Sequence, residues 1–165
     1  MPHTWNDKDT FDDEPSYRRG ASWYRRELPL GADLVGKRLY LYFEGANQVA
    51  EVYVNTNLVG KHIGGYTAFA YDITDDITLM KPNFISVRVD NSFNADIAPL
   101  SGDFNMYGGI YRDVWLIAAD DLHFKIDDMA SSGLQISTPE LDEKAGKVRV
   151  RGTVSNTGRK AAEVE

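Results

Sequence analysis

Short segments in which apolar and polar residues alternate limit this chain to a fold built from β-strands. Leu39, Leu41 and Phe43 alternate with more polar residues between positions 37 and 44, and residues 84–90 repeat the pattern. Successive side chains of a strand point to opposite faces, so a period of two is what a strand with one wet face requires. The alternation therefore predicts strands that each bury one face in a core.

Turn signals separate further segments of the same kind. Asn55-Thr56-Asn57 predicts a tight hairpin, because asparagine tolerates positive φ better than other non-glycine residues. Only residues 72–80 have room for a short helical turn, with Thr74 as its N-cap. Many short strands with few helices predict an all-β sandwich of the jelly-roll type. The predicted strands cover residues 21–28, 37–44, 49–54, 58–63, 68–71, 84–90, 111–117 and 122–126.

A domain boundary is predicted near residues 118–121, where Ala-Ala-Asp-Asp ends the last strong strand. The chain beyond it is more polar, with strands expected only near 134–136 and 147–155. A complete immunoglobulin-like sandwich needs about 100 residues, more than this part contains. We predict a jelly-roll domain over residues 1–120 and a truncated immunoglobulin-like segment over 121–165.

Charge and cysteine content exclude several classes of protein. The 25 acidic residues outnumber the 18 lysines and arginines, and the net charge is −7. A nucleic-acid-binding protein normally shows the opposite balance. The absence of cysteine excludes disulfides, thiol nucleophiles and cysteine zinc sites. No apolar run approaches the ~18 residues of a membrane helix, so we expect neither a nucleic acid nor a membrane as partner.

Residues 92–109 form a long connection between two strong strands and show no period of their own. Loops of this length are usually functional or disordered. This one places aromatic residues beside carboxylates and amides, as sugar sites do, where rings cover the apolar C–H face and polar groups bind hydroxyls. The alternative is that Phe93, Phe104 and Tyr107 only anchor the loop to the sandwich. Local sequence by itself favours that alternative.

Other motifs predict no chemistry of their own. Adjacent carboxylates occur at 12–14, 75–76 and 120–121, but neighbours on a strand face opposite ways, so these clusters indicate solvated turns rather than a glycosidase pair. The three histidines lack metal-ligand spacing. A calcium site built from loop aspartates and carbonyls stays open, because calcium needs only oxygen ligands, but the sequence lacks the spaced Asp-x-Asp loop that would support it strongly. We predict no catalytic residue, no metal and no cofactor in this chain.

Six blocks of sequence, taken in order, resemble a known family. They are Gly20–Arg26, Leu41–Gly45, Glu51–Asn55, Gly64–Phe69, Val87–Asn91 and Asp103–Val114. Together they resemble the N-terminal sugar-binding domain of glycoside hydrolase family 2, the family of β-galactosidases and β-glucuronidases. The resemblance covers residues 2–119, and the Gly-Gly-Ile-Tyr-Arg-Asp-Val run is its most specific part. Residues 121–165 resemble the start of the immunoglobulin-like second domain of that family.

The resemblance implies a galactose-binding-like jelly roll that precedes a catalytic (β/α)8 barrel, and the two catalytic glutamates of the family lie on that barrel. This chain alone would then be inactive, packing on its own barrel and lending loop residues to the sugar pocket of a retaining β-glycosidase, with a β-galactoside as the expected substrate. The aspartate before the aromatic-Gly-Gly block is the family residue that reaches a sugar hydroxyl, which here is Asp103. Asn91, and after it Arg18 and Arg19, are further candidates for the same rim.

Two other functions are open at this point. A free-standing carbohydrate-binding module would need an exposed aromatic platform from Trp5, Trp23, Tyr66 or Tyr107. The place of Trp23 in an alternating strand predicts a core position instead. A purely structural domain for interdomain or oligomer contact would need an exposed apolar patch. Assembly into homo-oligomers and location in a bacterial periplasm or cytoplasm stay open.

Overall fold

A computed structural model of the chain describes residues 2–9, 18–100 and 106–163. Its regular secondary structure is almost entirely β, as predicted. The helical segments whose bounds are described, Ala32–Leu34 and Thr74–Asp76, are single 3-10 turns. The strands of the main body are β1 (Ala21–Leu28), β2 (Arg38–Phe43), β3 (Val49–Val54), β4 (Asn57–Ile63), β5 (Phe69–Asp72), β6 (Asn83–Asp90) and β7 (Val114–Ala119). The strands that follow are β8 (Leu122–Phe124), β9 (Leu134–Leu141), β10 (Gly146–Gly152) and β11 (Val154–Asn156).

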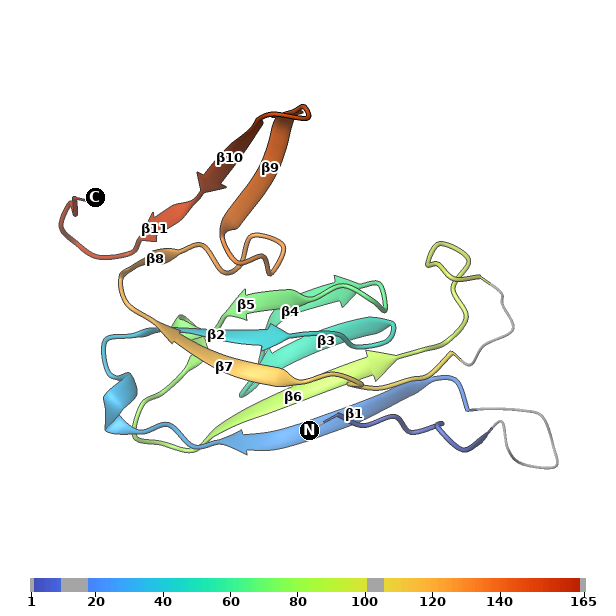
Figure 1. Ribbon diagram of the computed structural model, residues 1–165. Helices are drawn as coiled ribbons and strands as arrows, with labels where there is room; N and C mark the ends of the chain where they lie inside the picture. Colours follow the sequence, from blue (N-terminus) through green and yellow to red (C-terminus); the bar gives the residue numbers. More distant parts are fainter. Residues whose placement is uncertain (1, 10–17, 101–105, 164–165) are drawn as a thin grey trace.

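Two antiparallel sheets form the sandwich of the main body (Figure 1). One sheet has the strand order β1-β6-β3-β4, and the other has the order β5-β2-β7. Register follows the alternation: Val52 of β3 lies opposite Val87 of β6, so the apolar residues of both strands share the inner face. The predicted sandwich is confirmed.

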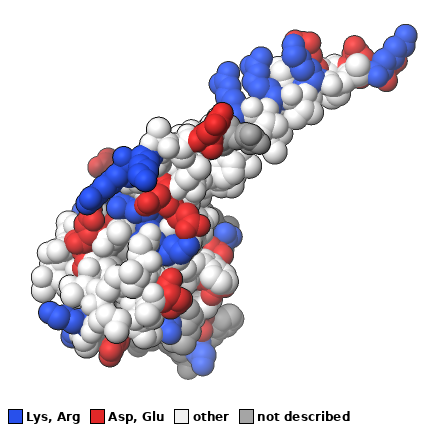
Figure 2. Space-filling view, turned by 90° about the vertical axis from the view of Figure 1, so that its left-hand side faces the viewer, with Lys and Arg blue, Asp and Glu red and all other residues white. Residues whose placement is uncertain are grey.

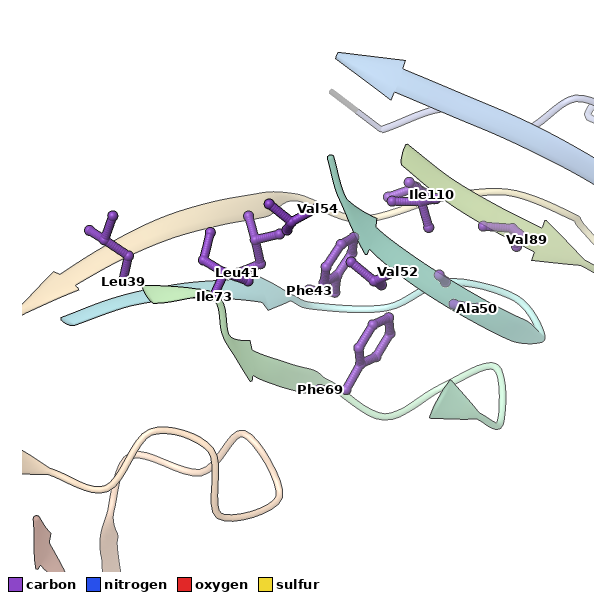
Figure 3. Packing of buried hydrophobic residues seen from close by; sticks show 12 residues of the cluster. Leu39, Leu41, Phe43, Ala50, Val52, Val54, Phe69, Ile73, Val89 and Ile110 are labelled. Carbon is purple, nitrogen blue, oxygen red and sulfur yellow. The ribbon is translucent and has the colours of Figure 1, made fainter. Parts of the chain in front are cut away.

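The core lies between the inner faces of the two sheets (Figure 3). Phe43 of β2 is fully buried and stacks on Phe69 of β5, with ring centroids 4.7 Å apart. His62 of β4 continues the stack, 4.2 Å from the Phe69 ring. Burial lowers the pKa of His62, because a charged imidazole loses hydration there. Rings from both sheets therefore close this end of the core.

Trp23 differs from its predicted core position. It is 60% exposed and lies opposite Arg88 on the outer face of the β1-β6-β3-β4 sheet, 5.6 Å from the Tyr53 ring. Its neighbour Tyr24 points inward and packs against the core. Alternation shows that two faces exist but does not say which one is buried, and here both carry an aromatic residue.

The two predicted turns form with small differences. Asn55 has φ of 55° at the β3–β4 hairpin, the left-handed conformation predicted for it. Thr74 begins its 3-10 turn as the first residue rather than as the N-cap, which is Ile73. The Thr74 hydroxyl instead donates to Asp72 Oδ1 at 2.6 Å and accepts a hydrogen bond from the Leu39 amide at 2.9 Å.

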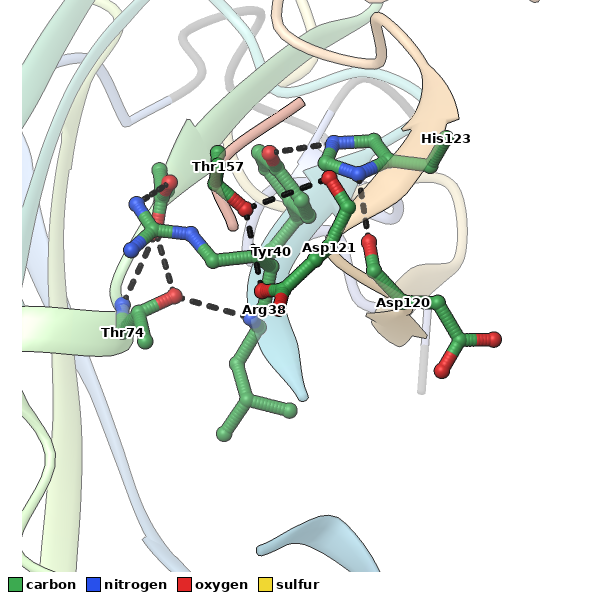
Figure 4. Close-up of polar contacts among 9 residues, drawn as sticks. Arg38, Tyr40, Thr74, Asp120, Asp121, His123 and Thr157 are labelled. Carbon is green, nitrogen blue, oxygen red and sulfur yellow. Dashed lines mark hydrogen bonds and ion pairs between the residues drawn. The ribbon is translucent and has the colours of Figure 1, made fainter. Parts of the chain in front are cut away.

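A polar junction joins the main body to the strands that follow residue 120 (Figure 4). Tyr40 on the outer face of β2 bonds His123 Nε2 of β8 at 2.8 Å, and His123 Nδ1 lies 2.6 Å from the Asp120 carbonyl. Since a carbonyl can only accept, His123 Nδ1 donates to it. Beside it, Arg38 forms an ion pair with Asp72. Hydrogen bonds from His123 on both sides of its ring thus join β2 to the start of β8.

Asp72 makes this junction sensitive to acid. Burial alone would raise the pKa of Asp72, but hydrogen bonds from Thr74 and Arg38 outweigh burial and lower it below the ordinary 3.8. The stability that Asp72 contributes is therefore complete above pH 3.8 and is lost as pH falls through its lowered folded pKa.

We expect Asp72→Asn to lower the melting temperature at pH 7. The difference in melting temperature from the wild type should shrink as pH falls below 3.8, as measured by thermal unfolding across pH. Asp33→Asn, on the exposed 3-10 turn, is the control, and a constant gap between Asp72→Asn and wild type at every pH would contradict the assignment.

Beyond the junction, β9 and β10 form a projecting hairpin whose two faces differ. Ile136 and Val150 pair on one face and are both exposed. Arg149 and Arg151 alternate with these residues and lie on the other face of the hairpin. Basic side chains follow the projecting segment in Figure 2. Elsewhere on the face that Figure 2 shows, both charge signs are interspersed.

The division of the chain into two domains at residue 120 stays a prediction. None of the helices in the described part of the chain has the length and apolar character to cross a membrane.

Candidate functional site

The long connection after β6 is the candidate site. Of its residues, 92–100 and 106–109 are described, and Asp103 and Phe104 lie outside the described residues. Ile97 and Met106 are buried and anchor the loop. Phe93 is 63% exposed and Tyr107 is 40% exposed. Ile97 and Met106 thus bury part of the loop, whereas the Phe93 and Tyr107 rings lie partly on the surface.

The first leg of the loop is held where β6 ends. Gln48, buried in the β2–β3 connection, donates from Nε2 to the Ser92 carbonyl at 3.2 Å. The Ser92 amide donates to Asp90 Oδ1 at 2.9 Å. Burial alone would raise the pKa of Asp90, but the bonds from Ser92 and the nearby charge of Arg88 lower it overall. An ionised carboxylate therefore fixes the exit of the chain from the sheet.

Asn91 does not lie on the rim of the site, where the sequence suggested it. It is fully buried, and its Oδ1 accepts from the Gly20 amide while its Nδ2 donates to the Met106 carbonyl, both at 2.8 Å. Buried amides are stable only when their groups are paired, and Asn91 satisfies this with backbone groups from both sides of the loop. Its side chain supports the loop and does not face the solvent.

Two further buried asparagines, which the sequence analysis did not single out, hold the second leg. Asn6 accepts from the Gly108 amide at 2.9 Å and donates to the Met106 carbonyl at 3.2 Å. Asn47 Nδ2 donates to the Tyr107 carbonyl. Nothing in the local sequence marks these residues, because their partners lie 100 and 60 positions away.

The Gly-Gly pair at the end of the loop is required by close packing of the N-terminal segment. A Cβ on Gly108 would lie 2.1 Å from Trp5 Cζ2, and a Cβ on Gly109 would lie 2.3 Å from the His3 carbonyl oxygen. Gly109 also has φ of +132°, a region that side chains with a Cβ rarely adopt. The glycines therefore let the segment 3–6 pack directly on the loop.

Arg18 and Arg19 lie beside the N-terminal segment and the loop after β6, and their predicted role in binding sugar stays a prediction. Arg19 Nε donates to the Asn91 carbonyl at 2.8 Å, and its guanidinium lies 5.9 Å from the Phe93 ring. Arg18 is exposed, with Nη2 donating to Ser22 Oγ at 3.0 Å and its guanidinium 5.9 Å from the Trp5 ring. Arg19 is thus attached to the loop itself, whereas Arg18 lies beside it.

The described part of the site combines exposed rings and guanidinium groups on a base that buried amides hold, an arrangement that suits hydroxyl-rich ligands. Of the acidic clusters noted in the sequence, residues 12–14 lie outside the described residues. Asp75 lies in a 3-10 turn, and Asp120 pairs with Lys37 at 2.5 Å. Within the described ranges, no group of three or more His, Asp or Glu side chains could hold a metal ion.

Comparison with known proteins identifies relatives of this arrangement. Residues 7–120 match the family described as glycosyl hydrolases family 2, sugar binding domain. A β-glucuronidase of Bacteroides fragilis is 40% identical over 156 residues, which are 94% of this chain and 22% of that protein. A β-galactosidase of Thermoanaerobacter pseudethanolicus is 42% identical over 126 residues, which are 74% of this chain and 17% of that protein.

A solved structure shares the fold closely. The crystal structure of a Bacteroides uniformis β-glucuronidase matches with a TM-score of 0.89 and 45% sequence identity, over 94% of this chain and 18% of that one. The chain therefore spans about a fifth of the length of the relatives that it matches. What these relatives share with it is a β-sandwich that forms a small part of a much longer protein.

Proposed function

Because this chain belongs to the sugar-binding domains of glycosyl hydrolase family 2, we propose that it is the N-terminal, non-catalytic domain of a retaining β-glycosidase. In this role it packs against a catalytic barrel and lends loop residues to the sugar pocket. The observation that supports the proposal is the loop after β6, whose two legs are fastened by buried amides while Phe93 and Tyr107 stay exposed. A loop held in this way can place polar groups against a sugar without further ordering.

The chain's part in the reaction is to position substrate. A carboxylate pair on the barrel would perform the double displacement of a retaining enzyme. Asp103 is the residue of this chain that we propose accepts a hydrogen bond from a sugar hydroxyl. A rigid loop and one charge-assisted bond would orient the glycoside before the barrel carboxylates act.

The proposed substrate class is a terminal β-galactoside or β-glucuronide. The resemblance in sequence favoured a galactoside, whereas relatives named for either sugar are similarly close to this chain, at 40% and 42% identity. Hydrolysis of nitrophenyl β-galactoside and nitrophenyl β-glucuronide by the longer glycosidase distinguishes the two. If the longer glycosidase cleaves neither substrate, the proposal is contradicted.

A free-standing carbohydrate-binding module is the second candidate, and one observation favours it. Trp23 is exposed beside Tyr53 on the outer face of a sheet, where a ring pair could cover a sugar. We expect the isolated chain to show neither hydrolysis nor saturable amide NMR shifts with galactose or lactose, because the pocket is completed by the barrel. Saturable shifts at residues 92–109 or around Trp23 would instead support the module.

A further inference from the structure

Three consecutive residues of the loop's second leg are each held through the backbone by a buried asparagine side chain. The Met106 carbonyl accepts from Asn91 at 2.8 Å and from Asn6 at 3.2 Å. The Tyr107 carbonyl accepts from Asn47, and the Gly108 amide donates to Asn6 at 2.9 Å. We call Asn6, Asn47 and Asn91 the asparagine clamp.

The members of the clamp come from three separate parts of the fold and are themselves fixed. Asn6 belongs to the N-terminal segment, Asn47 to the β2–β3 connection and Asn91 to the end of β6. Asn91 Oδ1 is occupied by the Gly20 amide. Asn47 also pairs with Gly109 through both backbone groups, at 3.0 and 3.3 Å. Buried amides that are hydrogen-bonded resist displacement, because moving one would leave polar groups unsatisfied.

The clamp leaves one side chain of the leg on the surface. Met106 and Gly108 are buried, whereas the Tyr107 ring between them is 40% exposed. A ring whose own backbone is fixed on both sides loses little further freedom when it meets a ligand. The exposed part of the ring can cover the apolar C–H side of a sugar.

We propose that Tyr107 is a sugar-contacting residue and that Asn6, Asn47 and Asn91 are positioning residues that hold it at the pocket. The inference rests on the proposed function, since it assigns a substrate contact to the same loop. The clamp acts through the Met106–Gly108 backbone, because its buried side chains bond backbone groups of the protein.

The test is steady-state kinetics of the longer glycosidase carrying Asn91→Asp. This change keeps the shape and the Oδ1 acceptor but places an oxygen against the Met106 carbonyl where a donor was. We expect kcat/KM to fall at least tenfold. Asn83→Asp is the matched control: Asn83 is fully buried at the other end of β6, and its Nδ2 donates to the Thr78 and Lys81 carbonyls at 2.9 Å each. We expect it to lower the melting temperature comparably while kcat/KM stays within twofold of the wild type.

A mutant cycle shows whether the clamp acts through Tyr107. Tyr107→Ala should lower kcat/KM at least tenfold, and Tyr107→Phe should recover most of that loss because it keeps the ring. Adding Asn91→Asp to Tyr107→Ala should lower kcat/KM by no more than about twofold again. If Asn91→Asp does not fold, Asn47→Ser carries the same test, since it removes the bond to the Tyr107 carbonyl and keeps the backbone pairing with Gly109.

The outcomes separate this inference from the proposed function. If Asp103→Asn and Tyr107→Ala both leave kcat/KM unchanged, the loop does not meet sugar and the proposed function fails. If Asp103→Asn impairs the enzyme and Tyr107→Ala does not, the inference alone is overturned. It is also overturned if the clamp variant loses no more activity than Asn83→Asp, or if its effect adds fully to that of Tyr107→Ala.

Discussion

Gly109→Ala is expected to lower the free energy of unfolding by about 3 kcal/mol or more, because two penalties act together. The backbone at Gly109 has φ of +132°, which strains a residue with a Cβ. The added methyl would also lie 2.3 Å from the His3 carbonyl oxygen and 2.6 Å from the Tyr24 hydroxyl. Backbone atoms cannot rotate away, so the N-terminal segment would have to lift off the loop. The His3–Ile110 hydrogen bond of 2.7 Å would be lost with it.

Gly20→Ala is the control that separates the two penalties. Gly20 has a similar φ of +142°, but a Cβ there meets nothing within 4 Å. Urea unfolding of both variants should show a loss of about 1 kcal/mol for Gly20→Ala, from backbone strain alone, and a clearly larger loss for Gly109→Ala. Equal losses would mean that the segment 3–6 is not seated against Gly109 as the structure shows.

Asp103→Asn in the longer glycosidase is expected to lower kcat/KM at least tenfold. A carboxylate that accepts a hydrogen bond from a substrate hydroxyl contributes about 1.5–3 kcal/mol, roughly twice the value of a neutral acceptor. The change to asparagine keeps the shape and removes the charge, so the loss reports the charge-assisted bond. Because the bond orients the sugar, we expect kcat to fall as well as KM to rise.

Asp96→Asn provides the comparison within the same loop. Asp96 is exposed in the described part of the loop, where its amide donates to Asn94 Oδ1 at 2.9 Å. Its substitution should leave kcat/KM within twofold of the wild type. Unchanged kinetics for Asp103→Asn would remove Asp103 from the sugar site, and equal losses for both variants would point to the general charge of the loop instead.

Much of the fold was predictable from local patterns, because strands are defined by alternation between near neighbours. Residues 21–28 and 49–54 were predicted as strands with the bounds that the structure has. The hairpin at Asn55 followed from a conformational preference of one residue type. The prediction for Trp23 was wrong, since which face of β1 is buried depends on where the second sheet packs, and β1 carries an aromatic residue on each face.

The sequence alone also singled out the loop that we propose binds sugar, because its length, its lack of period and its Gly-Gly block are all local features. Tertiary structure decided which of its neighbours support it and which can meet a ligand. Asn91 reads as a polar rim residue but is buried, and Asn6 shows no signal at all. The reason is physical: a buried amide is stable only with partners, and the partners of Asn6 on the loop lie 100 and 102 positions away along the chain. Only packing of the N-terminal segment on the loop brings them together.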